Sequence, residues 1–107
     1  MPAFFRTDKK LSSTEVTKAF IDRSEKSVEL NAYITNDFTS ALDKAKKFDQ
    51  KPNLDLKLPG IPMAVKDLFC TKDIKTTAGS KILNNFVPTY DSTVTENIWK
   101  NPLFEYD

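Results

Sequence analysis

The stretch LPGIPMAVKD, residues 58–67, gives the clearest indication of buried structure in this chain. A Pro-Gly turn precedes a short apolar run, and such a run after a turn predicts a buried strand, here Ile61–Val65. The run ends at Lys66, whose charge resists burial, so its amine must reach water or find partners. A lysine desolvated at this position can act as a base, which makes Lys66 a candidate catalytic residue. The alternative is an ordinary solvated lysine at a strand end.

Two helices are predicted before this stretch. Ser12 and Glu15 have the spacing of a capping box, which predicts a helix at Ser13–Glu25. A second helix is predicted at Phe38–Asp49, because the apolar residues there recur at helical spacing. Between the two helices, alternating apolar residues predict a short extended segment at Leu30–Thr35.

The region after the apolar run predicts turns and a third helix. A threonine-rich turn is expected around Gly79, followed by a helical turn at Ser80–Phe86. Asp91 or Ser92 can cap the third helix, which would run through Ile98. Together these elements predict an α/β fold with one apolar cluster. Its expected members are Val16, Phe20, Leu42, Phe48, Ile61, Met63 and Val65.

The composition fits a soluble globular chain and excludes several kinds of site. Of 107 residues, 39% are hydrophobic and 29% are charged, and the net charge of +1 gives no overall field that attracts nucleic acid. The absence of histidine excludes Ser-His-Asp catalysis and most catalytic zinc sites. The single cysteine, Cys70, excludes an internal disulfide and is expected to be a small buried side chain. Two glycines are too few for a Walker loop or a dinucleotide fingerprint. We therefore expect a cytoplasmic protein with no metal site, no cofactor of its own and no membrane contact.

Several separate motifs resemble the amidase signature family. In chain order they are LSSTE at 11–15, LNAYIT at 30–35, the LPGIPMAVKD stretch, FCTK at 69–72, TTAGS at 76–80 and NFVP at 85–88. The resemblance extends from about residue 11 to about residue 101 and keeps the order of the family pattern. FCTK and NFVP make the chain most similar to the glutaminase subunits of tRNA-dependent amidotransferases, which serve Glu-tRNA(Gln) or Asp-tRNA(Asn).

The resemblance implies how the chain would fit into the family fold. In that fold, helices pack on a large mixed sheet. Residues 1–107 would form the N-terminal portion of the amidase domain, with the helices and the first strand, so the fold is expected to be incomplete. Residues 102–107 match no motif of the family and are expected to form a divergent tail.

The resemblance also implies a catalytic group. Family members hydrolyse amides with a serine nucleophile, a second serine in a cis peptide, and a lysine, and Lys66 stands at the position of that lysine. Ser80 and Asp67 are candidates for supporting it through hydrogen bonds, whereas Thr76 and Thr77 are interpreted as structural. Both family serines lie in a later serine- and glycine-rich region, so the nucleophile is expected to be absent from these 107 residues.

Partners and cofactors follow from the same resemblance. The family subunit would release ammonia from its substrate glutamine within a heterotrimeric amidotransferase. A partner subunit would bind tRNA and use ATP and magnesium, so this chain would meet tRNA only through that partner. Two alternatives stay open at this point: a truncated general amidase and a non-catalytic interaction module.

We predict that the isolated 107-residue chain releases no ammonia from glutamine. A lysine base without a hydroxyl within hydrogen-bonding reach cannot start acyl transfer. A coupled ammonia assay with the purified chain tests this. Ammonia release above the buffer rate that disappears in Lys66→Ala would contradict the prediction.

Overall fold

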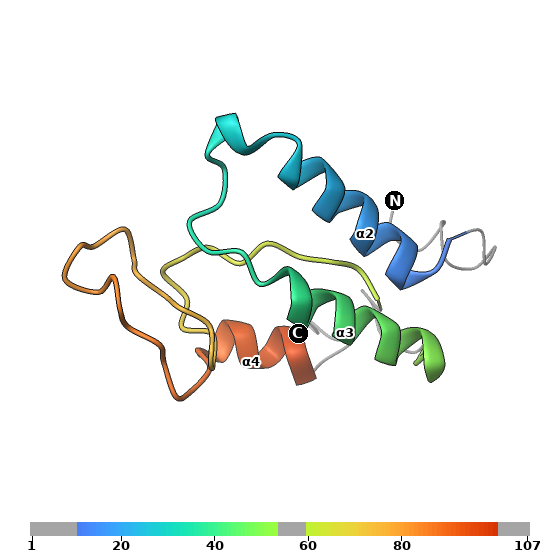
Figure 1. Cartoon of the computed structure of the whole chain (residues 1–107). Helices are drawn as coiled ribbons and strands as arrows, with labels where there is room; N and C mark the ends of the chain where they lie inside the picture. Colours follow the sequence, from blue (N-terminus) through green and yellow to red (C-terminus); the bar gives the residue numbers. More distant parts are fainter. Residues whose placement is uncertain (1–10, 54–59, 101–107) are drawn as a thin grey trace, which may run out of the picture. The chain divides into compact units, whose positions relative to one another are not determined.

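The computed structural model describes residues 11–53 and 60–100, and its helices are drawn in Figure 1. They are α2 (Ser13–Glu25), the short 3₁₀ helix η1 (Val28–Leu30), α3 (Phe38–Gln50) and α4 (Thr93–Lys100). The chain divides between Met63 and Ala64 into two units, which are considered separately below. None of the helices in the described ranges has the length and apolar character needed to cross a membrane.

Helix α2 has the predicted bounds, and the predicted capping box is present at its start. The Ser12 hydroxyl accepts a hydrogen bond from the Glu15 amide at 3.1 Å, and the Glu15 carboxylate accepts one from the Ser12 amide at 2.7 Å. Two amides that the helix itself cannot pair are thereby satisfied. Local sequence therefore explains where this helix begins.

A carboxylate from the second helix also caps the start of α2. Asp49, near the end of α3, accepts hydrogen bonds from the Ser13 and Thr14 amides, both at 2.9 Å, and from the Thr14 hydroxyl at 2.5 Å. Helices α2 and α3 pack against each other, and this contact joins the start of one to the end of the other. The two helices are therefore antiparallel, and a negative charge lies at the positive end of the α2 dipole.

Gly60 also contacts the start of α2 and the end of α3. The Ser13 hydroxyl donates a hydrogen bond to the Gly60 carbonyl at 2.6 Å. Gly60 has φ +70, and a Cβ at this position would lie 2.7 Å from the Phe48 ring. Both the left-handed backbone and the close ring require glycine here. Gly60 is thus held between the start of α2 and the Phe48 ring of α3.

The second unit consists of loops held by hydrogen bonds, followed by α4. Residues 70–76 and 86–92 lie side by side. The carbonyls of Cys70, Pro88 and Phe86 accept hydrogen bonds from the amides of residues 92, 73 and 76, at 2.8, 3.0 and 3.1 Å. Ser92 caps α4, because its hydroxyl accepts a hydrogen bond from the Thr95 amide at 3.2 Å. Of the two predicted caps, Ser92 is therefore the one used.

Two predicted extended segments are not strands in the described residues. The expected segment at 30–35 begins within η1, and Asn31 follows in a left-handed conformation with φ 48. The Ile61–Val65 run has no strand pairing either. A strand exists only where a second backbone accepts its hydrogen bonds, and the part of the chain that the structure describes contains just one isolated bridge, Thr71 to Ile74. The alternation of apolar residues in the sequence does not show whether such a partner strand is present.

None of the predicted members of the apolar cluster is fully buried, and two of them are exposed. Phe20 is 62% exposed and Met63 is 42% exposed, while Ala45 is buried at 5%. The other buried side chains include many hydroxyls: Ser13, Thr17, Thr71, Thr76, Thr77 and Thr95. Helical spacing identified an apolar face but could not show whether another element covers it. In the described residues, short hydroxyl side chains bonded to the backbone occupy most of the buried positions.

We predict that Asp49→Ala lowers the free energy of unfolding by about 1–2 kcal/mol, because it removes a cap shared between two helices. Burial by itself raises the pKa of Asp49, but the hydrogen bonds from Thr14 and Ser13 outweigh it and hold the pKa below 3.8. A carboxylate with a lowered folded-state pKa stabilises above its unfolded-state pKa, and this contribution is lost as the pH falls through the folded-state value. Urea unfolding at pH 7 and in acid measures both effects.

The matched control is Asp43→Ala, an exposed aspartate on the same helix. Its free energy of unfolding should change by less than about 0.5 kcal/mol. Equal losses in the two variants would show that Asp49 does not act as a cap.

Candidate functional site

Lys66 is exposed in the described residues, so of the two alternatives left by the sequence its side chain reaches water here. The reason is the missing strand pairing: no neighbouring strand in the described ranges covers the run that ends at this lysine. Its backbone is nevertheless fixed, because the Lys66 carbonyl accepts a hydrogen bond from the Phe69 amide at 3.0 Å. The amine therefore projects from a defined turn into open space.

Asp67, which follows Lys66, is bound by a second turn that begins ten residues further along the chain. The Asp67 carboxylate accepts hydrogen bonds from the Thr77 amide at 2.9 Å, from the Gly79 amide at 3.4 Å, and from the Thr77 hydroxyl. The Asp67 carbonyl accepts another from the Ala78 amide at 2.8 Å. Sequence analysis named Asp67 as a candidate, and the structure joins it to Thr77.

The ionisation of Asp67 follows from these contacts. Burial by itself raises the pKa of this carboxyl group, but hydrogen bonds from Thr77 and Gly79 and the positive charge of Lys75 outweigh it. The pKa of Asp67 consequently lies below its ordinary value, and the group is an anion at neutral pH. An anion accepting several donors makes stronger hydrogen bonds than a neutral acceptor would.

The other hydroxyl residues of this region have different roles. Thr76 is buried and its hydroxyl donates to the Ile74 carbonyl at 3.1 Å, which agrees with the structural interpretation. Ser80 is half-buried and its amide donates to the Thr77 carbonyl at 2.9 Å. The structure thus places Ser80 at the end of the turn that holds Asp67.

Cys70 is half-exposed, so the expectation of a buried thiol is wrong. Its sulfur donates a hydrogen bond to the Tyr90 hydroxyl at 3.7 Å. The Cys70 carbonyl links this loop to α4, because it accepts a hydrogen bond from the Thr95 hydroxyl at 2.7 Å. Thr95 is completely buried, which fixes α4 to this loop.

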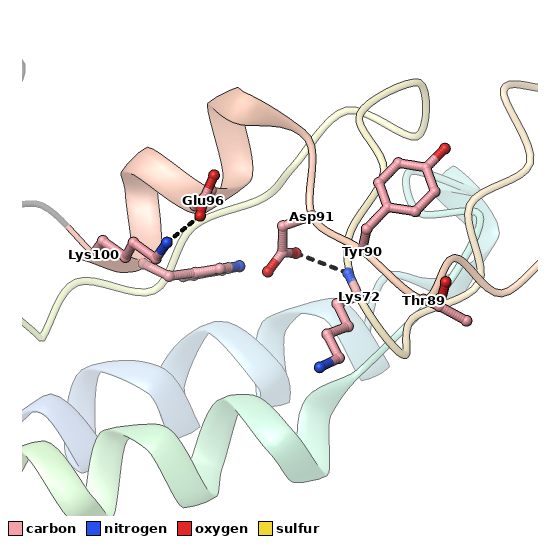
Figure 2. A pocket seen from close by; sticks show the side chains of 7 residues that line it. Lys72, Thr89, Tyr90, Asp91, Glu96 and Lys100 are labelled. Atoms are coloured by element: carbon pink, nitrogen blue, oxygen red, sulfur yellow. Dashed lines mark hydrogen bonds and ion pairs between the residues drawn. The ribbon is translucent and has the colours of Figure 1, made fainter.

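An open pocket of about 410 Å³ lies in the second unit, and Lys66 is not among its lining residues (Figure 2). Three of the charged side chains that line it have partners. The Asp91 carboxylate accepts the Lys72 amide at 2.8 Å, and Lys100 forms an ion pair with Glu96 along α4. The pocket is therefore an open hollow in which Asp91, Glu96 and Lys100 are already paired.

The cap from Asp49 was not predicted from the sequence, and for Asp67, which was a predicted candidate, the partner Thr77 was not. Asp49 caps a helix that begins 36 residues earlier in the chain, and no local pattern signals such a contact. The interaction of Asp67 with Thr77 spans ten residues, although the TTAGS motif did indicate a turn with a hydroxyl donor. Among the described residues, no group of three or more histidine, cysteine, aspartate or glutamate side chains is arranged to hold a metal ion.

Known proteins with similar sequences extend this description. A protein from Pelagibacter ubique, named as a glutamyl-tRNA(Gln) amidotransferase subunit, is 78% identical over 92 residues, which cover 86% of this chain. Proteins of the same name from Rickettsia bellii and Caulobacter vibrioides are 49% and 47% identical over 94 and 95 residues, which cover 86% and 87% of the chain. The chain spans about 19% of the length of each of these relatives. The sequence model of the amidase family matches residues 15–102, and the chain belongs to that family.

Proposed function

We propose that this chain supplies the N-terminal part, including the catalytic lysine, of the glutamine-hydrolysing subunit of a glutamyl-tRNA(Gln) amidotransferase. The observation that carries the proposal is the 78% identity to the Pelagibacter ubique protein, which is named as a subunit of that enzyme. That relative is about five times longer than the matched region, which is 19% of its length. In this proposal the serine nucleophile comes from the remaining part of such a subunit.

Lys66 is the base in the proposed reaction. A serine oxygen would attack the side-chain amide carbon of glutamine, and its proton would pass to the Lys66 amine, directly or through the second serine. The same proton would then move to the departing nitrogen as the carbon–nitrogen bond breaks and ammonia leaves. Water would release glutamate from the acyl-enzyme. Lys66 is exposed in the described residues, so its amine is accessible to groups from elsewhere in the subunit. Desolvation by those groups would favour the neutral amine that a base requires.

The proposal also gives the Ile61–Val65 run a partner. In a full-length subunit, strands from the later sequence would pair with this run and complete a mixed sheet. Pairing would cover the run up to Lys66 and leave the amine at the edge of the sheet. Ser80, at the end of the turn that holds Asp67, is proposed to support the amine through its hydroxyl group.

The remaining assignments depend on the complex. Ammonia would pass to a partner subunit of a heterotrimer, and that subunit would bind Glu-tRNA(Gln) and use ATP with magnesium. The two glycines of this chain are too few for a glycine-rich phosphate-binding loop. A reaction on tRNA would take place in the cytoplasm.

We predict that Lys66→Arg abolishes glutamine hydrolysis in a full-length context. The 92 matched residues of this chain would replace their counterparts in the Pelagibacter ubique relative, and the chimeric subunit would be assembled with that relative's partner subunits. The unsubstituted chimera should release ammonia from glutamine. Arginine keeps the positive charge but cannot accept a proton at neutral pH, so kcat should fall by about 10²- to 10⁴-fold.

Lys81→Arg is the matched control, because Lys81 is also an exposed lysine of the second unit. It should keep the kcat of the unsubstituted chimera. Near-normal turnover by Lys66→Arg would remove Lys66 from the mechanism. A chimera that hydrolyses simple amides better than glutamine would point to a general amidase.

A further inference from the structure

Three consecutive amides of the 77–79 turn point at the residue that follows Lys66. The Thr77 and Gly79 amides donate to the two carboxylate oxygens of Asp67, and the Ala78 amide donates to its carbonyl. The Thr77 hydroxyl adds a fourth hydrogen bond. Asp67 is thus bound at both its side chain and its backbone, next to the proposed base.

The backbone of this turn is strained in a way that these bonds explain. Ala78 has φ 50 and Gly79 has φ 68, two successive left-handed residues, of which only glycine adopts that region readily. Such strain persists where surrounding contacts fix it, and it is concentrated at functional sites. A Cβ on Gly79 would meet no atom within 4 Å, so crowding does not explain the conformation. Successive amides in this arrangement form a concave anion site. Its occupant here is the chain's own carboxylate.

We propose that Asp67 and Thr77 are positioning residues that fix the direction of Lys66. The Lys66 carbonyl is bound on one side by Phe69, and the next residue is bound on the other side by the 77–79 turn. This leaves the lysine side chain as the free part of a rigid segment. The inference rests on the proposed role of Lys66 as base, because only then does its direction affect a rate.

We call the contact of Asp67 with the 77–79 turn the clamp. The burial of Thr77 and the charge of Asp67 agree with a clamp that is already formed in this chain. Thr77 is only 4% exposed, so water does not compete for its hydroxyl. The lowered pKa of Asp67 keeps the acceptor ionised at neutral pH, where the hydrolysis would take place. Misplacement of a reacting group by about 1 Å can reduce a rate about 100-fold.

The test uses the chimeric subunit described above, in complex with its partner subunits. Asp67→Ala removes the acceptor, Thr77→Val removes one donor at nearly constant shape, and Thr77→Ser keeps that donor. Asp67→Ala and Thr77→Val should lower kcat for glutamine by about 10- to 100-fold and change KM by less than about twofold. Thr77→Ser should retain kcat close to that of the unsubstituted chimera.

Asp49→Ala is the matched control, because Asp49 also accepts two amides and a threonine hydroxyl but belongs to the first unit. It should lower the thermal midpoint and leave kcat unchanged at a temperature where the complex is folded. If Asp67→Ala prevents folding, the Thr77→Val and Thr77→Ser pair still decides the question.

The outcomes separate the two proposals. If Lys66→Arg is inactive while folded Asp67→Ala and Thr77→Val keep normal kcat, the clamp is only structural and this inference is wrong. A fall in kcat that follows the thermal midpoint equally in Asp49→Ala and Thr77→Val would also overturn it. If the unsubstituted chimera releases no ammonia, the proposed function itself fails.

Discussion

Hydrogen bonds from backbone amides to aspartate carboxylates hold the key segments of this chain in place. Asp49 receives the first amides of α2, and Asp67 receives amides of the 77–79 turn. In each case a threonine hydroxyl adds a further bond. A carboxylate can accept several donors at once, so one side chain satisfies amides that the backbone alone leaves unpaired. Both aspartates have a pKa below the ordinary value for this reason, although burial acts in the opposite direction.

This dependence on hydrogen bonds agrees with the distribution of apolar and polar side chains. Most buried positions in the described residues are serine or threonine, and their hydroxyls bond to nearby backbone groups. Large apolar side chains such as Ile82, which is 94% exposed, remain at the surface. Each hydrogen bond contributes about 0.5–1.5 kcal/mol net, so several together can fix local geometry without a large core. Under the proposed function, the rest of a full-length subunit would cover the exposed apolar faces.

The two units contribute differently to the proposed chemistry. The first is a helix pair whose ends are tied by Asp49 and Ser13, and none of its residues is proposed to react. The second carries Lys66 on a turn between two hydrogen-bonded points, and the lysine side chain is exposed. The base and the nucleophile of the proposed reaction would therefore come from separate segments. The rate would then depend on how rigidly each segment is held, which is the role proposed for Asp67 and Thr77.

Features that depend on residues close together in the chain could be predicted from the sequence. Helix α2, its capping box and the start of α3 were predictable, because a helix pairs residues three or four positions apart. The ordered motifs also identified the family and the candidate lysine. Other features could be seen only in the folded chain: the exposure of Phe20 and Lys66, the absence of pairing at Ile61–Val65 in the described residues, and the cap from Asp49. Each of these depends on whether a distant segment supplies a covering surface or a hydrogen-bond donor, and a local pattern carries no information about that.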